Sequence, residues 1–441
     1  MPSFAQSIFF LLAGIFVIIM LTAKWNVHAF FALMIACFVT GIGVQLPVTD
    51  ILGAMKDGFG NIMRSLAFII VLGTTLGVVL EHTGSTKVMA AFILKKTGER
   101  NAALAMSITG FIVGLPVFCD SGFVVLSGLN KSLAKRTGIP IAVTSVSLGT
   151  GLLAVHCLIP PHPGAAAAAG VMGVDIGKLM LTGIAVAIIP MLAGYWWAKQ
   201  AGKKTITTIE DEELLPGTSK HLPSTLQAFA PVIVPVILIA LKSFLTIENN
   251  EGAVMKIIAV LGDPVIALSI GVICAFAGSR QWNKIIAGKL LTESVGKAGS
   301  ILVIIGAGGA FGAVLTATKL GDHLSNISSL SSIGILFPFL VTFILKTAQG
   351  SSTVAIITAA PIILPLLNAL HLNSDTGRLL CVLSMGAGST MISHVNDAYF
   401  WVIAKFTGID MRTMLKVYTV ATIIMGIVTM LIVYLLSLIL L

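Results

Sequence analysis

Apolar residues in this chain come in long uncharged runs, not in the alternating patterns of surface helices or half-buried strands. A run of about 20 such residues is long enough to cross a bilayer as a helix, so the pattern predicts an all-α polytopic membrane protein with about 10 full spans. The predicted spans are 5–23, 28–47, 62–82, 140–173, 178–199, 229–247, 256–278, 297–318, 376–408 and 413–437.

Two further apolar segments, 102–134 and 333–371, contain helix-breaking or polar residues at their centres. The first is interrupted by Gly114 and Pro116, and the second by the polar run 349–353. Each is about as long as two half-membrane helices at ~1.5 Å rise per residue. We therefore predict two re-entrant hairpins, whose breaks must be covered by protein or by a water-filled cavity.

Two of the predicted spans carry a break of their own. Segment 140–173 contains Pro160, Pro161 and Pro163 within four residues, and proline both lacks a backbone donor and breaks a helix. Segment 376–408 has a polar run, Ser-His-Val-Asn-Asp, in the corresponding place. We predict a broken helix in each.

The two halves of the chain resemble each other. The sequence from Gly173 resembles that from Gly408, and the same offset of 235 residues places His162 on Asp397. Each half then has an odd number of crossings, so the second half must be inverted relative to the first. The predicted organisation is a first inverted repeat at 1–199, a cytoplasmic linker at 200–228 and a second inverted repeat at 229–441.

Charge and composition narrow the function and the location. Only 10% of the residues are charged, and the net charge of +9 comes from basic residues scattered through connectors, which argues against a nucleic-acid partner. Most of the 27 Lys and Arg fall on one predicted side. The positive-inside bias makes that side cytoplasmic and places both termini in the periplasm of a bacterial inner membrane. The five cysteines stand singly and no catalytic motif occurs, so we expect no enzyme activity, metal or cofactor.

Inverted repeats with broken helices are typical of secondary transporters whose site lies near the bilayer midplane. The N-termini of half-helices there suit a carboxylate. The alternative is that the polar residues at the breaks only cap helices. The predicted substrate-binding residues are Ser121, Gly122, His156, His162, Lys346, Gly350, Ser351, Ser352, Thr353, His394, Asn396 and Asp397.

Two acids, Asp120 and Asp397, stand deep in otherwise uncharged segments. A carboxylate at such depth costs roughly 2.5–3.5 kcal/mol and usually marks a pathway or a relay. Burial also favours its neutral form, as a proton carrier requires. We predict both as proton-coupling residues and prefer Asp120; the alternative is a structural carboxylate. Lys346 either meets the substrate carboxylate or extends outward along its hairpin arm.

These motifs resemble those of the gluconate permease family of proton symporters, within the ion-transporter superfamily. The residues that carry the resemblance lie at 114–124, 160–164, 306–311, 349–355 and 393–397. The resemblance implies proton-coupled uptake of gluconate or a related sugar acid or hydroxy acid. It also implies an elevator-like movement of the hairpin-bearing domain against a dimeric scaffold, and hence a homodimer.

The sequence departs from that family at two positions. Asp120 stands where members often have Glu followed by an apolar residue, and Lys346 stands where they often have Arg. Lysine lacks the bidentate fork of arginine, which favours a smaller acid such as glycerate. Two alternatives stay open: a sodium-coupled carboxylate transporter, since hydroxyl-rich tips can also hold sodium, and a passive anion channel.

Overall fold

The computed structural model describes residues 4–203, 205, 222–245, 253–278, 284–318 and 333–441. All regular secondary structure in these ranges is helical. Six of the described helices are long and apolar enough to cross a membrane, or seven if one bent pair counts as a single span. The chain is therefore an α-helical multi-pass membrane protein, as its hydropathy predicts. The predicted linker 200–228 lies mostly outside the described residues.

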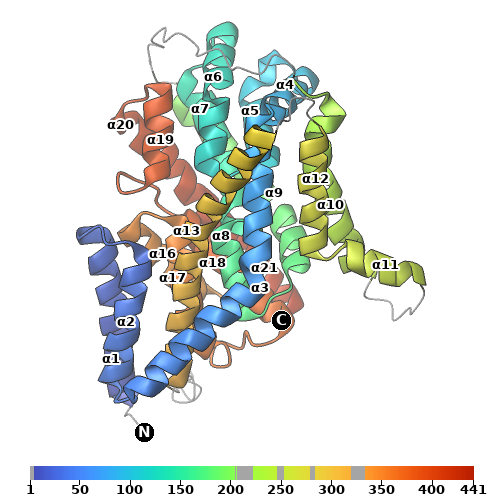
Figure 1. The fold of residues 1–441 in the computed structure, drawn as a ribbon. Helices are drawn as coiled ribbons and strands as arrows, with labels where there is room; N and C mark the ends of the chain where they lie inside the picture. Colours follow the sequence, from blue (N-terminus) through green and yellow to red (C-terminus); the bar gives the residue numbers. More distant parts are fainter. Residues whose placement is uncertain (1–3, 204, 206–221, 246–252, 279–283, 319–332) are drawn as a thin grey trace.

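In chain order the helices fall into two sets, one before and one after the predicted linker, and Figure 1 shows that helices of the two sets pack together. The first set is α1 (Phe4–Ile19), α2 (Ala29–Gly43), α3 (Val48–His82), α4 (Ser85–Thr97), α5 (Ala102–Gly114), α6 (Cys119–Thr137), α7 (Ile141–Leu158), α8 (Pro163–Met172) and α9 (Ile176–Gly202). The second set is α10 (Thr225–Leu245), α11 (Ala253–Leu261), α12 (Pro264–Ala277), α13 (Lys284–Ala317), α16 (Leu336–Gln349), α17 (Ser352–Ile363), α18 (Asp375–Thr390), α19 (Ala398–Thr407), α20 (Met411–Met414) and α21 (Val420–Leu440). A short π-helical segment, η4 (Leu415–Thr419), joins α20 to α21.

The long helices α3 and α13 pack against each other through the middle of the molecule. Both begin well before the spans predicted at 62–82 and 297–318. The early part of α3 is amphipathic, with Ile51 and Ile62 buried while its charged residues lie exposed. A mean hydropathy window therefore misses it, although the helical spacing of its buried residues continues unbroken.

The predicted span 256–278 is not one straight helix. Helices α11 and α12 meet there at a bend of 67°. Asp263 accepts a hydrogen bond from the backbone N–H of Val265 at 2.9 Å, and Pro264 occupies the first helical position. This Asp-Pro pair is a helix-start signal that divides the segment.

Both segments predicted as hairpins are divided into two helices at the predicted places. In the first, α5 ends at Gly114 and α6 begins at Cys119. In the second, α16 ends at Gln349 and is followed by Gly350, which has a left-handed φ of 80°; Ser351 then caps α17. A side chain at Gly350 would be strained by this φ and would also meet the carbonyl oxygen of Asn396.

The two predicted broken helices are also interrupted where the sequence indicates. Helix α7 ends at Leu158 and α8 begins at Pro163, after a cis peptide bond between Pro160 and Pro161. Helix α18 ends at Thr390, and α19 begins after Asp397. The four segments predicted as hairpins or broken helices thus each contain one break, two in each half of the chain.

Packing between the halves brings these breaks together. Helix α17 packs against α8, α19 packs against α6, and α18 packs against both α7 and α8. Small residues allow the close approach: Gly386 of α18 faces the carbonyl of Cys157 in α7, and Gly164 of α8 faces the backbone of Thr353 in α17. Four helix ends and their polar residues consequently lie around one point.

Candidate functional site

A cavity of about 590 Å³ lies where the four breaks meet. Its walls come from the first turns of α6 and α17, the last turn of α7, the start of α8, the segment before α19, and α13. The predicted site residues that line it are Asp120, Ser121, His156, Gly350, Ser351, Ser352, Thr353, Asn396 and Asp397. Residues from both halves of the chain therefore share one chamber.

Three other predicted site residues lie behind the cavity wall. Gly122 packs against the side chain of Leu152. The Nε2 atom of His162 lies 2.6 Å from the carbonyl oxygen of Gly114. This contact joins the break between α7 and α8 to the break between α5 and α6. His394 Nε2 lies 3.3 Å from the carbonyl oxygen of Thr347. These residues hold the breaks in place rather than facing a ligand in this conformation.

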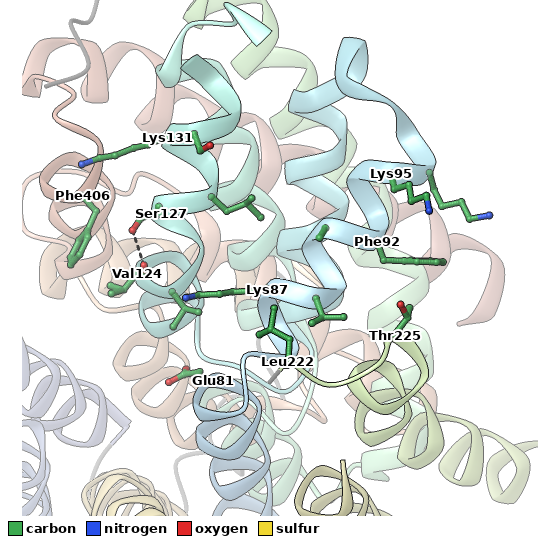
Figure 2. A pocket seen from close by; sticks show the side chains of 17 residues that line it. Glu81, Lys87, Phe92, Lys95, Val124, Ser127, Lys131, Leu222, Thr225 and Phe406 are labelled. Atoms are coloured by element: carbon green, nitrogen blue, oxygen red, sulfur yellow. Dashed lines mark hydrogen bonds between the residues drawn. The ribbon is translucent and has the colours of Figure 1, made fainter. Parts of the chain in front are cut away.

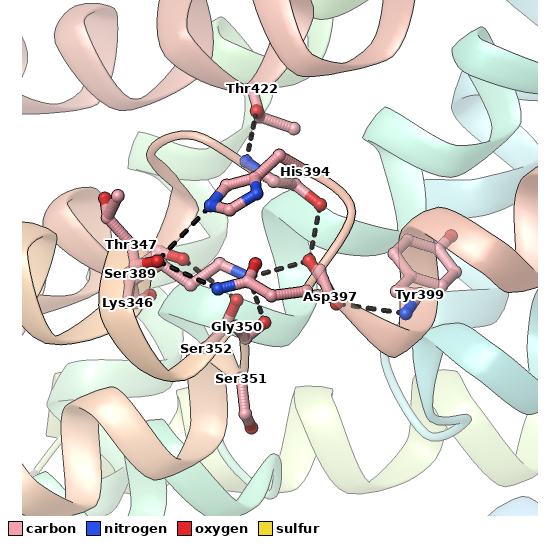
Figure 3. Close-up of polar contacts among 12 residues, drawn as sticks. Lys346, Thr347, Gly350, Ser351, Ser352, Ser389, His394, Asp397, Tyr399 and Thr422 are labelled. Atoms are coloured by element: carbon pink, nitrogen blue, oxygen red, sulfur yellow. Dashed lines mark hydrogen bonds and ion pairs between the residues drawn. The ribbon is translucent and has the colours of Figure 1, made fainter. Parts of the chain in front are cut away.

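Lys346 also lies behind the wall, in a buried ion pair (Figure 3). Its side chain is 1% exposed, and its Nζ atom lies 2.6 Å from Oδ2 of Asp397. The same ammonium donates to the carbonyl oxygen of Gly350 at 2.5 Å. Asp397 also accepts from the Ser393 hydroxyl and, through Oδ1, from the backbone N–H of Tyr399 at 3.0 Å. Asp397 is thus both the N-cap of α19 and the partner of the lysine.

Hydroxyl groups at the second break are already used within the protein. Ser351 accepts from the backbone N–H of Val354 at 3.3 Å, and Ser352 donates to the carbonyl of Ser389 at 2.9 Å. Thr353 Oγ1 lies 3.1 Å from Nε2 of His156. These bonds fix the tip, and each hydroxyl has a second hydrogen-bonding capacity that can face the cavity.

Asp120 differs from Asp397 in its surroundings. It lies in the first turn of α6, is exposed to the cavity, and makes no hydrogen bond or ion pair with the described residues that line the chamber. Phe118, at the N-cap position, provides no side-chain cap. The first N–H groups of α6 and the Asp120 carboxyl are therefore open to water or to a ligand.

Comparison with known proteins assigns the chain that forms this chamber to a transporter family. A family model described as GntP family permease matches residues 6–439. The chain belongs to the GntP permease family. A gluconate permease of Pseudomonas aeruginosa is 33% identical over 96% of each chain. The D-serine transporter DsdX of Escherichia coli is 32% identical over 97% of each chain.

Membership of the GntP family confirms the predicted resemblance and the class of function: the chain is a transporter and not an enzyme. Its fold is similar to that of a solved transporter. The crystal structure of the YdaH transporter of Alcanivorax borkumensis matches with a TM-score of 0.60 at 14% identity, covering 86% of each chain. At that identity the likeness concerns the fold alone.

Several residues around the cavity of this GntP permease were not among the predicted site residues. Gln349 lines the cavity, and neither its side-chain oxygen nor its nitrogen has a partner among the described residues. Lys297 reaches the cavity from α13 and is paired with Glu293 at 2.9 Å. Gln349 is the first residue of the polar run 349–353 in the second predicted hairpin, so the sequence could have indicated it as a site residue. Nothing in the sequence near Lys297 indicates that it reaches the cavity.

A second hollow of about 1210 Å³ lies between α4 and α6 of this GntP permease. It is lined by Glu81 and by lysines that include Lys87, Lys95 and Lys131 (Figure 2). Figure 2 shows that Lys95 points away from Lys87 and Lys131, so the lysines do not converge on one point. The Glu81 carboxyl lies beside the Ser121 hydroxyl, which brings the end of this hollow next to the chamber.

Proposed function

We propose that this GntP permease takes up gluconate or a related sugar acid or hydroxy acid by proton symport across the bacterial inner membrane. The observation that carries the proposal is one chamber in which breaks from both halves present hydroxyl groups, helix N-termini and two acids, one of which, Asp397, is paired with the buried Lys346 behind the wall. Such a chamber suits a small hydroxylated carboxylate. Asp120 and Asp397 are the proposed proton-coupling residues.

The proposed organisation is two inverted repeats, each with a re-entrant hairpin and a broken helix, in about 10 full spans. Helices α8 and α19 support it, since both are 10 residues long and their bounds differ by the predicted 235 positions. Gly173 and Gly408 end these helices with φ values of 67° and 71°. Asp175 and Asp410 then cap the helices that follow. In this arrangement both termini lie in the periplasm.

The names of the relatives indicate the chemical class of the substrate. Gluconate and D-serine, for which two relatives are named, both carry a carboxylate close to a hydroxyl group. Hydroxyl and amide groups from Ser351, Thr353 and Asn396 border the chamber and can bond such hydroxyls. Gly122, His162 and His394, which were predicted to bind substrate but do not line the chamber, then act by holding the breaks in place. We propose the same elevator-type movement and homodimeric scaffold that the family resemblance implies.

Uptake of labelled gluconate into vesicles that contain the purified protein tests this proposal. A proton gradient alone should drive accumulation above equilibrium, and unlabelled glycerate or another sugar acid should compete. Accumulation driven by a sodium gradient and indifferent to pH would instead support the sodium-coupled alternative. Flux that does not saturate, without counterflow exchange, would indicate a channel.

A further inference from the structure

We propose that the substrate carboxylate and the Asp397 carboxylate are alternative partners of the Lys346 ammonium, and that a proton on Asp397 exchanges one for the other. This inference rests on the proposed proton symport and adds the group that enforces it. The Lys346–Asp397 pair is then the coupling device of the carrier, not only a structural ion pair.

The geometry places Asp397 between the lysine and the cavity. Asp397 lines the chamber, whereas Lys346 lies directly behind it with its Nζ atom 2.6 Å from Oδ2 of Asp397. The ammonium also donates to the carbonyl of Gly350, which lines the chamber as well, at 2.5 Å (Figure 3). Because Lys346 is already paired with Asp397, a carboxylate in the chamber can take its place only when Asp397 releases the ammonium.

The charges around Asp397 explain why release needs a proton. The titratable or charged groups that act on Asp397 or on its lysine partner come from α6, α7, α16, α19 and η4: Cys119, Asp120, His156, Cys157, Lys346, Tyr399 and Tyr418. Among these described groups Lys346 is the basic one that is paired with a carboxylate, that of Asp397, and it also acts electrostatically on Asp120. Lys297, which also lines the chamber, is paired with Glu293.

A third carboxylate, that of the substrate, is repelled by this arrangement unless one acid becomes neutral. Leaving a buried charge without its partner is strongly destabilising. A neutral Asp397 without substrate strands the lysine, and a bound substrate beside a charged Asp397 strands an anion. Proton and substrate therefore each favour the other, and this reciprocal effect is what thermodynamic coupling means.

The cap of α19 can survive the exchange. When a proton from water forms an O–H bond at Oδ2 of Asp397, Oδ1 still accepts from the backbone N–H of Tyr399. The new O–H can donate to the Ser393 hydroxyl, whose oxygen now accepts. No other covalent bond changes. On the opposite side of the membrane the substrate leaves, the proton returns to water and the ion pair forms again.

Binding of gluconate to the Asp397→Asn variant tests the inference, because asparagine keeps the cap but cannot hold the lysine as a carboxylate does. In the parent protein the apparent Kd should rise by about tenfold per pH unit on the alkaline side. In the variant the Kd should be independent of pH and close to the acid-pH value of the parent. Proton-driven accumulation should be lost while gluconate exchange persists.

Asp263→Asn is the matched control. Asp263 also caps a helix through the second following N–H and also faces a lysine, with Lys242 Nζ 3.8 Å from its Oδ2, but that pair lies away from the chamber. This control should keep the pH slope of the parent. A second variant, Lys346→Met, should lose gluconate binding at every pH.

The inference is overturned if a folded Asp397→Asn protein keeps the pH slope or loses binding at every pH. It is also overturned if Lys346→Met retains gluconate binding. If Asp397→Asn does not fold, Asp120→Asn can be used instead, because it leaves the Lys346–Asp397 ion pair intact. Binding of gluconate to this variant in weak buffer should still take up one proton from solution. If no proton is taken up, the inference is overturned. Proton-driven gluconate transport by the parent would stand in each case. Its absence from the parent would instead remove the proposed function.

Discussion

The imidazole of His156 and the hydroxyl of Thr353 lie 3.1 Å apart, measured from Nε2 to Oγ1, although 197 residues separate them in the chain. His156 belongs to the last turn of α7, in the first broken helix, and Thr353 to the first turn of α17. Both residues line the chamber. The contact therefore fixes one break of each half relative to the other.

Replacing Thr353 with Val should weaken gluconate binding about fivefold, as expected from the loss of one hydrogen bond of about 1 kcal/mol. The change keeps the shape of the side chain but leaves His156 Nε2 without its partner. Thr358→Val is the control, since Thr358 is buried in the same helix and its hydroxyl has no partner among the described residues. Equal affinities of both variants and the parent, measured with labelled gluconate, would exclude the contact from the site.

Asp120→Asn should slow proton-driven gluconate uptake at least about tenfold while leaving counterflow exchange at acid pH. The reason is that Asp120 is the acid exposed to the chamber and can exchange protons with its water, which a carrier needs at each turnover. Asp375→Asn is the control, because Asp375 is likewise an exposed acid in the first turn of a helix but lies outside the chamber. A normal rate of proton-driven uptake in the Asp120 variant would show that Asp120 is not on the route by which protons enter and leave the chamber.

Gln349→Leu should reduce the affinity for gluconate by about tenfold, because a buried amide that bonds a substrate hydroxyl contributes on the order of 1–3 kcal/mol. Gln349 lines the chamber with both amide atoms unpartnered among the described residues. Glycerate has fewer hydroxyl groups than gluconate, so the Gln349→Leu substitution should reduce its affinity less. Competition by the two acids against labelled gluconate measures this difference, and an equal loss for both would assign Gln349 to the tip structure.

The sequence predicted where the backbone breaks but not how the side chains meet there. Pro163, Gly350 and the serine after it have conformational preferences that can be recognised from residue type, so the break positions agree with the structure. The partner of Lys346 could not be found in this way, since Asp397 lies 51 residues away and the pairing depends on how α16 and α19 approach. The rotation of His162 toward Gly114 is likewise a consequence of packing.

The proposed inverted repeats predict the sides on which tags should appear. An odd number of crossings in the first half means that a tag before α1 and a tag within 200–228 report from opposite faces of the membrane. A tag after Leu441 should report from the same face as the first, because the second half also has an odd number of crossings. Labelling of single cysteines by an impermeant thiol reagent in intact cells measures this, in a background without the five native cysteines. If the amino terminus and the 200–228 segment are labelled from the same face of the membrane, the second half of the chain is not inverted relative to the first. The chamber would then not lie between two inverted repeats.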